Sequence, residues 1–357
     1  MGAKRAGFGV FGAPTGSGGS GAPTGPGGSG APTGSGGLAG ATGTGRGARV
    51  SRRGLLLGGA SMWALALAGC APERTRALAL ACGEPGGAYL QFGELLADAL
   101  AARAGTSLDL RVTHGSAENL EMLANGDVDL GLSLADTANE SAEPHDLAAI
   151  GRVYQNYLQC LVLATSDIAS FADLAGRRVS IGAPGSGSSR TTRRLLEAAL
   201  PAAGVGAPQA TELELAAALR ALSEGGIDAL FWSGGIPTPE ITAAASAHPL
   251  RVLDLGEAVA PLRAAHPREY LDARIPAGVY GTTRSTATVG ISNLLMCRAD
   301  LARDAARALV DVLVVDATRL VPSGSVGLQY LALDTLIDTG DVPLHPAAME
   351  RYRERYR

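Results

Sequence analysis

The sequence of 357 residues predicts an α/β fold in which a parallel sheet is covered by helices on both faces. From about residue 77 onward, short apolar runs of strand length alternate with stretches in which apolar residues recur at helical spacing. Strands joined through helices run parallel, and the helices then cover both faces of the sheet. Several loops after the apolar runs are also rich in glycine and serine, which mark the change from strand to helix.

The first group of elements extends from residue 77 to residue 164. Within 89–103, Phe92, Leu96 and Leu100 fall on one face of a helix, and Gly126 stands where a second helix should end. Strands are predicted over 77–82, 108–112, 128–133, 148–154 and 160–164, and helices over 89–103 and 117–124.

The second group follows the same alternation up to residue 321. Strands are predicted over 179–182, 229–232 and 287–297, and helices over 189–199, 216–223 and 239–247, with a long helical stretch over 298–321.

The first 49 residues have a different character. Residues 12–38 repeat a nine-residue unit of glycine, alanine, proline, serine and threonine, which cannot bury enough apolar surface to offset its ordering entropy. We therefore expect 1–49 to be disordered. The segment is either a flexible spacer or sequence translated upstream of the true start, and we favour the second reading, with initiation at Val50.

Residues 50–69 are arranged like an export signal, with a basic start, an apolar run and a cleavage motif. The basic start contains Arg52 and Arg53, which suits twin-arginine export, although general secretory export stays open. The apolar run over 55–68 is too short and glycine-rich to span about 30 Å of hydrocarbon. The sequence Leu-Ala-Gly before Cys70 matches a lipobox. We therefore expect an exported lipoprotein, palmitoylated at Cys70 and anchored to the outer face of the cytoplasmic membrane or lying in the periplasm, with residues 70–357 as the exported domain.

Composition excludes several classes of function. Lys4 is the only lysine, so neither a Walker A motif nor a Schiff-base lysine is available. Residues 1–69 hold six basic residues and no acidic one, so without them the formal net charge of −4 becomes −10. Such an acidic body is a poor nucleic-acid binder, because phosphate contacts supply most of that affinity.

The sequence also argues against an enzyme. The cysteines Cys82, Cys160 and Cys297 lie in apolar runs without CxxC spacing, so we expect buried thiols and no metal or other cofactor. The five histidines form no HExxH motif, and there is no G-x-S-x-G nucleophile elbow. We expect His114 to pack or cap rather than to contact a ligand, and His345 to be structural.

Three predicted helices start directly after loops that are rich in glycine or serine, at 83–87, 114–116 and 183–189. Glycine lets the backbone approach a ligand, and the free N–H groups of a first helical turn favour a negative group. Ordinary capping explains one such loop, but three after three strands predict a cleft lined by helix N-termini. Tyr89 and Trp232 stand in neighbouring segments and are suited to covering an apolar part of a ligand.

Eight short motifs occur in order along the predicted domain: GGAY at 86–89, GSAENL at 115–120, NGDVDLG at 125–131, GAPGSGS at 182–188, FWSGGIPT at 231–238, TVG at 288–290, RADL at 298–301 and GDVPLHP at 340–346. Together they resemble the TAXI class of solute receptors, which serve tripartite ATP-independent periplasmic (TRAP) transporters. The resemblance implies a type II periplasmic-binding fold with crossing hinge strands. Its lobe I would cover about 75–165 and 275–357, and lobe II about 166–274.

The resemblance also implies a ligand, a partner and contacts. The ligand would be a small carboxylate or an amino acid such as glutamate, and the partner the TRAP membrane subunits. A sensor that presents ligand to a membrane histidine kinase, or an enzyme on the same fold, stays open. The candidate ligand contacts are Tyr89, Ser116, Ser186, Gly187, Ser188, Gly234 and Gly235.

The chain departs from the family pattern near the predicted cleft. Cys82-Gly83-Glu84 replaces the usual Thr-Gly-Gly, Leu90 replaces a second tyrosine, and 134–135 reads Leu-Ala instead of Gln-Ser. A negative Glu84 would oppose an anion unless it points away. The ligand is therefore expected to be less acidic than glutamate, or to carry an amino group that Glu84 accepts.

Overall fold

The computed structural model describes residues 77–141 and 146–357. The predicted disordered segment, the signal segment and Cys70 lie outside the described residues. Among the helices that the structure describes, none has both the length and the apolar character needed to cross a membrane. All described elements lie in one compact unit, Ala71–Arg357.

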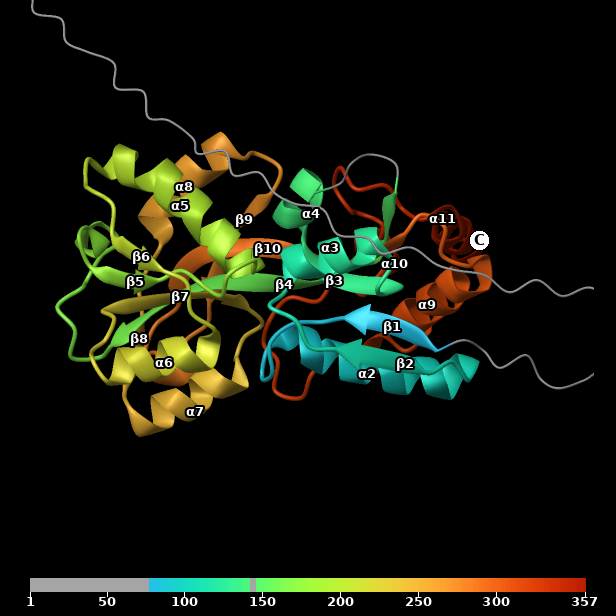
Figure 1. Ribbon diagram of the computed structural model, residues 1–357, viewed down its shortest axis with the longest axis horizontal. Helices are drawn as coiled ribbons and strands as arrows, with labels where there is room; N and C mark the ends of the chain where they lie inside the picture. Colours follow the sequence, from blue (N-terminus) through green and yellow to red (C-terminus); the bar gives the residue numbers. More distant parts are fainter. Residues whose placement is uncertain (1–76, 142–145) are drawn as a thin grey trace, which may run out of the picture. The chain divides into compact units, whose positions relative to one another are not determined.

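One sheet of ten strands runs through this unit (Figure 1). Its main order is β2-β1-β3-β10-β4-β7-β5-β6, while β8 pairs with β4 and β9 pairs with β10. The strands are β1 Leu78–Ala81, β2 Leu108–Arg111, β3 Leu130–Leu134, β4 Leu147–Leu163, β5 Arg178–Ser180, β6 Gln209–Thr211, β7 Ala229–Gly234, β8 Leu250–Val252, β9 Tyr270–Ile275 and β10 Thr286–Arg298.

Strands β4 and β10 belong to both lobes. The first part of β4 pairs with β10, and its last part pairs with β7 and β8. In the same way, β10 pairs with β9 at its start and with β3 at its end. Two α/β lobes joined by crossing strands are therefore present, and the predicted type II fold class is confirmed.

Two details of the sheet differ from the prediction. The sheet is mixed, because β4 and β10 run antiparallel to their neighbours, whereas β1, β2 and β3, and likewise β5, β6 and β7, pair in parallel. The two strands predicted over 148–154 and 160–164 are one strand. The polar pair Gln155 and Asn156 interrupts the apolar run, but both side chains are buried and hydrogen-bonded within the crossing region.

Helices cover both faces of the sheet in each lobe, as predicted (Figure 1). In lobe I, α2 and α9 pack on one face and α3 and α4 on the other; in lobe II, α5 and α8 lie opposite α6 and α7. The helices are α2 Ala88–Ala104, α3 Ser116–Asn125, α4 Ala135–Ser141, α5 Gly187–Ala203, α6 Leu215–Ser223, α7 Pro239–Ala247, α8 Gly256–Ala265, α9 Arg303–Val315, α10 Leu333–Leu336 and α11 Pro346–Arg355, with short 3-10 turns at Ala172–Leu174, Val279–Gly281 and Ala317–Leu320.

Apolar side chains at helical spacing explain how these helices dock. Phe92, Leu96 and Leu100 of α2 are buried against the lobe I sheet, as their spacing predicts. The predicted helical stretch over 298–321 is α9 followed by a 3-10 turn, since β10 continues to Arg298. The three described cysteines are free and buried, which confirms their predicted role as small core residues.

Candidate binding cleft

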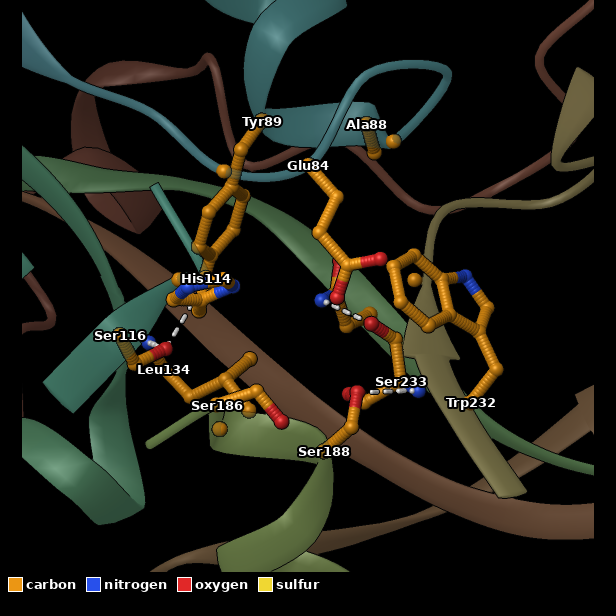
Figure 2. A pocket seen from close by; sticks show the side chains of 16 residues that line it. Glu84, Ala88, Tyr89, His114, Ser116, Leu134, Ser186, Ser188, Trp232 and Ser233 are labelled. Atoms are coloured by element: carbon orange, nitrogen blue, oxygen red, sulfur yellow. Dashed lines mark hydrogen bonds between the residues drawn. The ribbon is translucent and has the colours of Figure 1, made fainter. Parts of the chain in front are cut away.

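A cleft lies between the two lobes, where several strands end and helices begin (Figure 2). Lobe I contributes Gly83, Glu84, Gly87, Ala88, Tyr89, His114, Gly115, Ser116 and Leu134; β4 contributes Asn156; and lobe II contributes Ser186, Gly187, Ser188, Trp232, Ser233 and Gly234. The centre of a water molecule can move within about 40 Å³ of the cleft, so in this state it is small.

The three predicted helix starts meet in this cleft. Helix α2 begins after Gly87, α3 after Gly115 and α5 after Ser186. The Ser186 hydroxyl accepts a hydrogen bond from the backbone N–H of Ser189 at 3.1 Å, which is an ordinary helix cap. The N-termini of three helices therefore converge on the cleft, and their dipoles give it a positive backbone potential.

Gly187 allows the lobes to approach closely at the start of α5. A Cβ atom there would lie 2.6 Å from the Leu134 Cδ1 atom and 2.6 Å from the Ser116 Oγ atom, both in lobe I. Gly86 likewise lets the two lobes approach closely, because a Cβ atom added there would lie 2.5 Å from the Glu240 Oε1 atom of lobe II. Glycine is thus required at these positions by the facing lobe.

The lobe I wall is fixed by hydrogen bonds around Ser116. The Tyr89 and Ser116 hydroxyl oxygens lie 3.1 Å apart, and the Leu134 backbone N–H donates to the Ser116 Oγ atom at 3.1 Å. Burial raises the pKa of Tyr89 above its usual value, so its hydroxyl stays protonated. This wall offers neutral hydroxyl groups and an aromatic surface.

The lobe II wall contains two buried polar groups that have no partner among the described residues. These are the Trp232 Nε1 atom and the Ser233 Oγ atom, on side chains that are each 7% exposed. The Ser233 backbone is held in place, because its N–H donates to the Ser188 Oγ atom at 2.9 Å and its carbonyl accepts from the Asn156 Nδ2 atom at 3.2 Å. These bonds fix the Ser233 backbone beside the cleft, while the Ser233 hydroxyl and the Trp232 indole N–H stay without a partner among the described residues.

Glu84 projects between Tyr89 and Trp232 (Figure 2). Its Oε2 atom accepts a hydrogen bond of 2.8 Å from the Leu215 backbone N–H at the start of α6 in lobe II. Its Oε1 atom is buried and has no partner among the described residues. Burial raises the pKa of Glu84, and the Leu215 bond opposes that rise.

The cleft lining contains no arginine or lysine. Its one basic side chain is that of His114, about half exposed, whose Nδ1 atom lies 3.6 Å from the Glu214 carboxylate. His114 lines the cleft, and its expected role in packing or capping rather than ligand contact stays a prediction. His345, by contrast, caps α11 through its Nδ1 atom, as its structural role predicts.

Six of the seven predicted contact residues line this cleft together. The exception is Gly235, which lines a neighbouring cavity with Ala88, Phe92, Ile236 and the loop after Pro322. The roles of all seven predicted contact residues in ligand binding stay predictions. Sequence reasoning missed Asn156 and Ser233; the signal for Asn156 was a polar residue inside a long apolar run.

Other contacts also hold the lobes together. The Ala117 backbone N–H of α3 donates to the Gly185 carbonyl of lobe II at 3.3 Å. The buried Asp136 carboxylate of α4 accepts from the Thr191 hydroxyl at 2.7 Å and from the Tyr270 hydroxyl at 2.8 Å. With the Glu84–Leu215 bond, these contacts describe a closed state of the two lobes.

Neither a metal-binding group nor a serine bonded to a base is placed in the site among the described residues. Across 77–141 and 146–357, no group of three or more histidine, cysteine, aspartate or glutamate side chains is placed to hold a metal ion. Ser186 and Ser188 use their hydroxyls as acceptors for backbone N–H groups, and neither is bonded to a base among the described residues. Such an arrangement can bind and orient a small polar molecule.

Solved structures similar to this chain include three binding proteins. The periplasmic aliphatic sulphonate binding protein SsuA from Escherichia coli is 20% identical, with 78% of this chain and 82% of that chain covered and a TM-score of 0.40. The arginine-, lysine-, histidine-binding protein ArtJ from Geobacillus stearothermophilus is 16% identical, with coverage of 69% and 92% and a TM-score of 0.45. The GluR0 ligand-binding core from Nostoc punctiforme in complex with L-glutamate is 16% identical, with coverage of 68% and 95% and a TM-score of 0.39.

A family model assigns this chain to a sequence family that is broader than the TAXI class. Membership of the TAXI class itself stays a prediction from the motifs. The family model of the NMT1-like family matches residues 80–355, which include both lobes and every residue of the cleft. The chain therefore belongs to the NMT1-like family.

Proposed function

We propose that this protein is an exported solute-binding protein that captures a small, carboxylate-bearing molecule in the cleft and performs no chemistry on it. One observation carries the proposal: three helix starts converge on an interlobe cleft together with the buried, unpartnered Trp232 and Ser233 groups. N–H groups at helix starts favour anions, and unpartnered buried donors favour a ligand with acceptor atoms.

The crossing strands explain how binding could be signalled. A ligand that contacts both lobes favours the closed state, and closure around β4 and β10 changes the surface that a membrane partner meets. In our proposal that partner is the membrane part of a TRAP transporter, and Cys70 carries the lipid that holds the protein at the membrane. A Cys70→Ser chain that still fractionates with the membrane would contradict the anchoring role.

The capture role is tested with the chain 71–357. The sequence has two tryptophans, and Trp63 lies before residue 71, so Trp232 alone reports on the cleft by its fluorescence. A panel of small carboxylates and amino acids should contain compounds that change this fluorescence saturably. The same compounds should raise the melting temperature, since a ligand at 100 times its Kd stabilises by about 2.7 kcal/mol.

Two outcomes would count against capture. One is a panel in which no compound changes either the Trp232 fluorescence or the melting temperature. The other is turnover, seen as a product by mass spectrometry after incubation with a compound that binds. Free N-acetyltryptophanamide serves as the control for the optical signal, because a compound that only absorbs or quenches should change its fluorescence as well.

A further inference from the structure

We propose that the ligand carries a protonated amine as well as its carboxylate, and that Glu84 selects it by accepting hydrogen bonds from that amine. The ligand class is then a small zwitterion of the α-amino-acid type with a short, uncharged side chain. This inference rests on the proposed function, and it names the ligand class of the same cleft.

The strongest observation is the unpartnered oxygen of Glu84. The side chain is 8% exposed, its Oε2 atom is bonded to the Leu215 backbone N–H, and its Oε1 atom has no donor among the described residues. A buried carboxylate oxygen without a donor is costly. A ligand ammonium group supplies both donors and a compensating charge.

The lobe II wall lacks a hydrogen-bond acceptor, whereas Glu84 in lobe I lacks a donor. The Trp232 indole N–H can only donate, and it is buried without an acceptor among the described residues. The Ser233 hydroxyl is also without a partner there, and α5 begins beside it in the cleft lining. One wall therefore lacks an acceptor and the other lacks a donor, and a molecule with both a carboxylate and an ammonium group satisfies both.

The charge of the cleft lining and the size of the cleft restrict the class of ligand further. The cleft lining has no arginine or lysine to balance a second carboxylate, and Glu84 adds a negative charge of its own. A zwitterion has no net charge and brings one positive group to Glu84, whereas glutamate would bring an additional uncompensated carboxylate. Because the centre of a water molecule can move within only about 40 Å³ of the closed cleft, a small side chain such as that of alanine or serine is favoured.

The pH dependence of binding should follow Glu84. Burial raises the pKa of Glu84 above 4.5; the Leu215 N–H and His114 act in the opposite direction, and Glu214 and Glu240 add to the rise. An ammonium group binds the ionised carboxylate, so the affinity for alanine should increase as the pH rises through this pKa. A carboxylate without an amine should show the reverse, because it is repelled by ionised Glu84.

The test is isothermal titration calorimetry on the full chain with alanine, serine, lactate, propionate and glutamate. Lactate and propionate match alanine in size but lack the amine. We expect alanine or serine to bind at least about tenfold more tightly than lactate, propionate or glutamate, as the loss of a charge-assisted hydrogen bond predicts. This comparison needs no variant.

Glu84→Gln then identifies the residue responsible. The amide keeps an acceptor for the Leu215 N–H but loses the charge, so the affinity for alanine should fall by about tenfold or more and the preference over lactate should largely vanish. Glu214→Gln, at the neighbouring and half-exposed start of α6, is the matched control and should keep the preference. His114→Asn is included so that imidazole titration is not mistaken for that of Glu84.

The possible results separate the two proposals. If lactate or propionate binds wild type as tightly as alanine, or if Glu84→Gln keeps the preference for alanine, the role of Glu84 is wrong while carboxylate capture stands. If glutamate binds most tightly, the assignment of a small, uncharged side chain is wrong. If none of the five compounds binds, the assignment of a small amino acid is wrong, and the wider panel of carboxylates decides whether the proposed capture stands.

Discussion

At the scale of single residues, the cleft depends on positions where a side chain is missing. Gly187 starts α5, and the atoms nearest to its absent Cβ belong to Leu134 and Ser116 of the other lobe. The sequence indicated a glycine-rich loop before a helix, and this was sufficient to place Gly187 at the site. It could not show that the reason is contact with the facing lobe, because that contact joins segments more than 50 residues apart.

Gly187→Ala should therefore weaken ligand binding without weakening the fold. The added methyl group would press against the Leu134 and Ser116 side chains of lobe I, which opposes closure of the lobes, while alanine suits a helix better than glycine. We expect the affinity for any cleft ligand to fall by about tenfold, corresponding to roughly 1–2 kcal/mol of overpacking, with an unchanged or slightly higher melting temperature. Calorimetry and thermal denaturation measure the two quantities.

Gly206→Ala is the matched control. No atom lies within 4 Å of the Cβ atom it would add, and its backbone does not have a positive φ. It should leave ligand affinity unchanged. Equal affinity of the Gly187→Ala chain and wild type would show that the closed approach of the lobes plays no part in binding.

At the scale of elements, periodicity predicted most helices well and failed where polar residues are buried. Helix α2 differs from its predicted range by one residue at each end, because its apolar face is regular. Strand β4 was divided in two because Gln155 and Asn156 looked like the end of a strand, although side-chain partners satisfy them inside the crossing region. Helix α11 was missed, since it is short and mostly polar.

Charges rather than apolar residues tie the outer face of α11 to α9. Arg307 of α9 donates two hydrogen bonds to the Glu354 carboxylate of α11, at 3.0 and 2.7 Å, and Arg351 of α11 itself donates another at 2.6 Å. These bonds lower the pKa of Glu354 to about 2. Ion pairs of this kind have no signature in hydrophobic periodicity, which explains why the sequence did not predict the docking of α11.

The bonds to the Glu354 carboxylate should make the melting temperature of the protein depend on pH. The folded pKa of Glu354 lies below its ordinary value of 4.5, so its contribution is complete above about pH 4.5 and is lost as the pH falls toward 2. We expect Glu354→Gln to lower the melting temperature at pH 6 and to have a vanishing effect near pH 2. Thermal denaturation of both chains between pH 2 and 7 measures the difference.

Glu121→Gln is the control for Glu354. Glu121 is an exposed glutamate of α3, and no ion pair joins it to another described residue. Its substitution should leave the melting temperature unchanged over the same pH range. A difference between wild type and Glu354→Gln that stays constant from pH 6 to pH 2 would contradict the ion-pair explanation.

At the scale of the whole molecule, the two crossing strands β4 and β10 supply residues to the cores of both lobes. Val153 of β4 belongs to the lobe I core, while Leu158, five residues later, belongs to the lobe II core. Strand β10 divides in the same way, with Cys297 in the first core and Val289 in the second. The family resemblance implied two lobes with crossing hinge strands, but it did not indicate which strands cross or that each of them supplies residues to both cores.

The buried cysteines can test whether the two lobes unfold cooperatively, because they lie in different lobes. Cys82 belongs to the lobe I core and Cys160 to the lobe II core, and neither is exposed. Burial raises the pKa of Cys82 to about 12 and also raises that of Cys160, so neither thiol should react with a disulfide reagent in the folded protein. Labelling then reports the unfolding of the lobe that contains each thiol.

We expect two variants of the chain 71–357, one retaining only Cys82 and the other only Cys160, to become labelled at the same urea concentration. Each has its other two cysteines replaced by alanine, and each midpoint is compared with that from circular dichroism, which corrects for the cost of the substitutions. Unfolding either lobe removes part of β4 and β10 from the other core, so neither lobe should persist alone. If Cys160 were labelled well before Cys82, lobe II would unfold independently, and the crossing strands would act as flexible hinges without coupling the stability of the two cores.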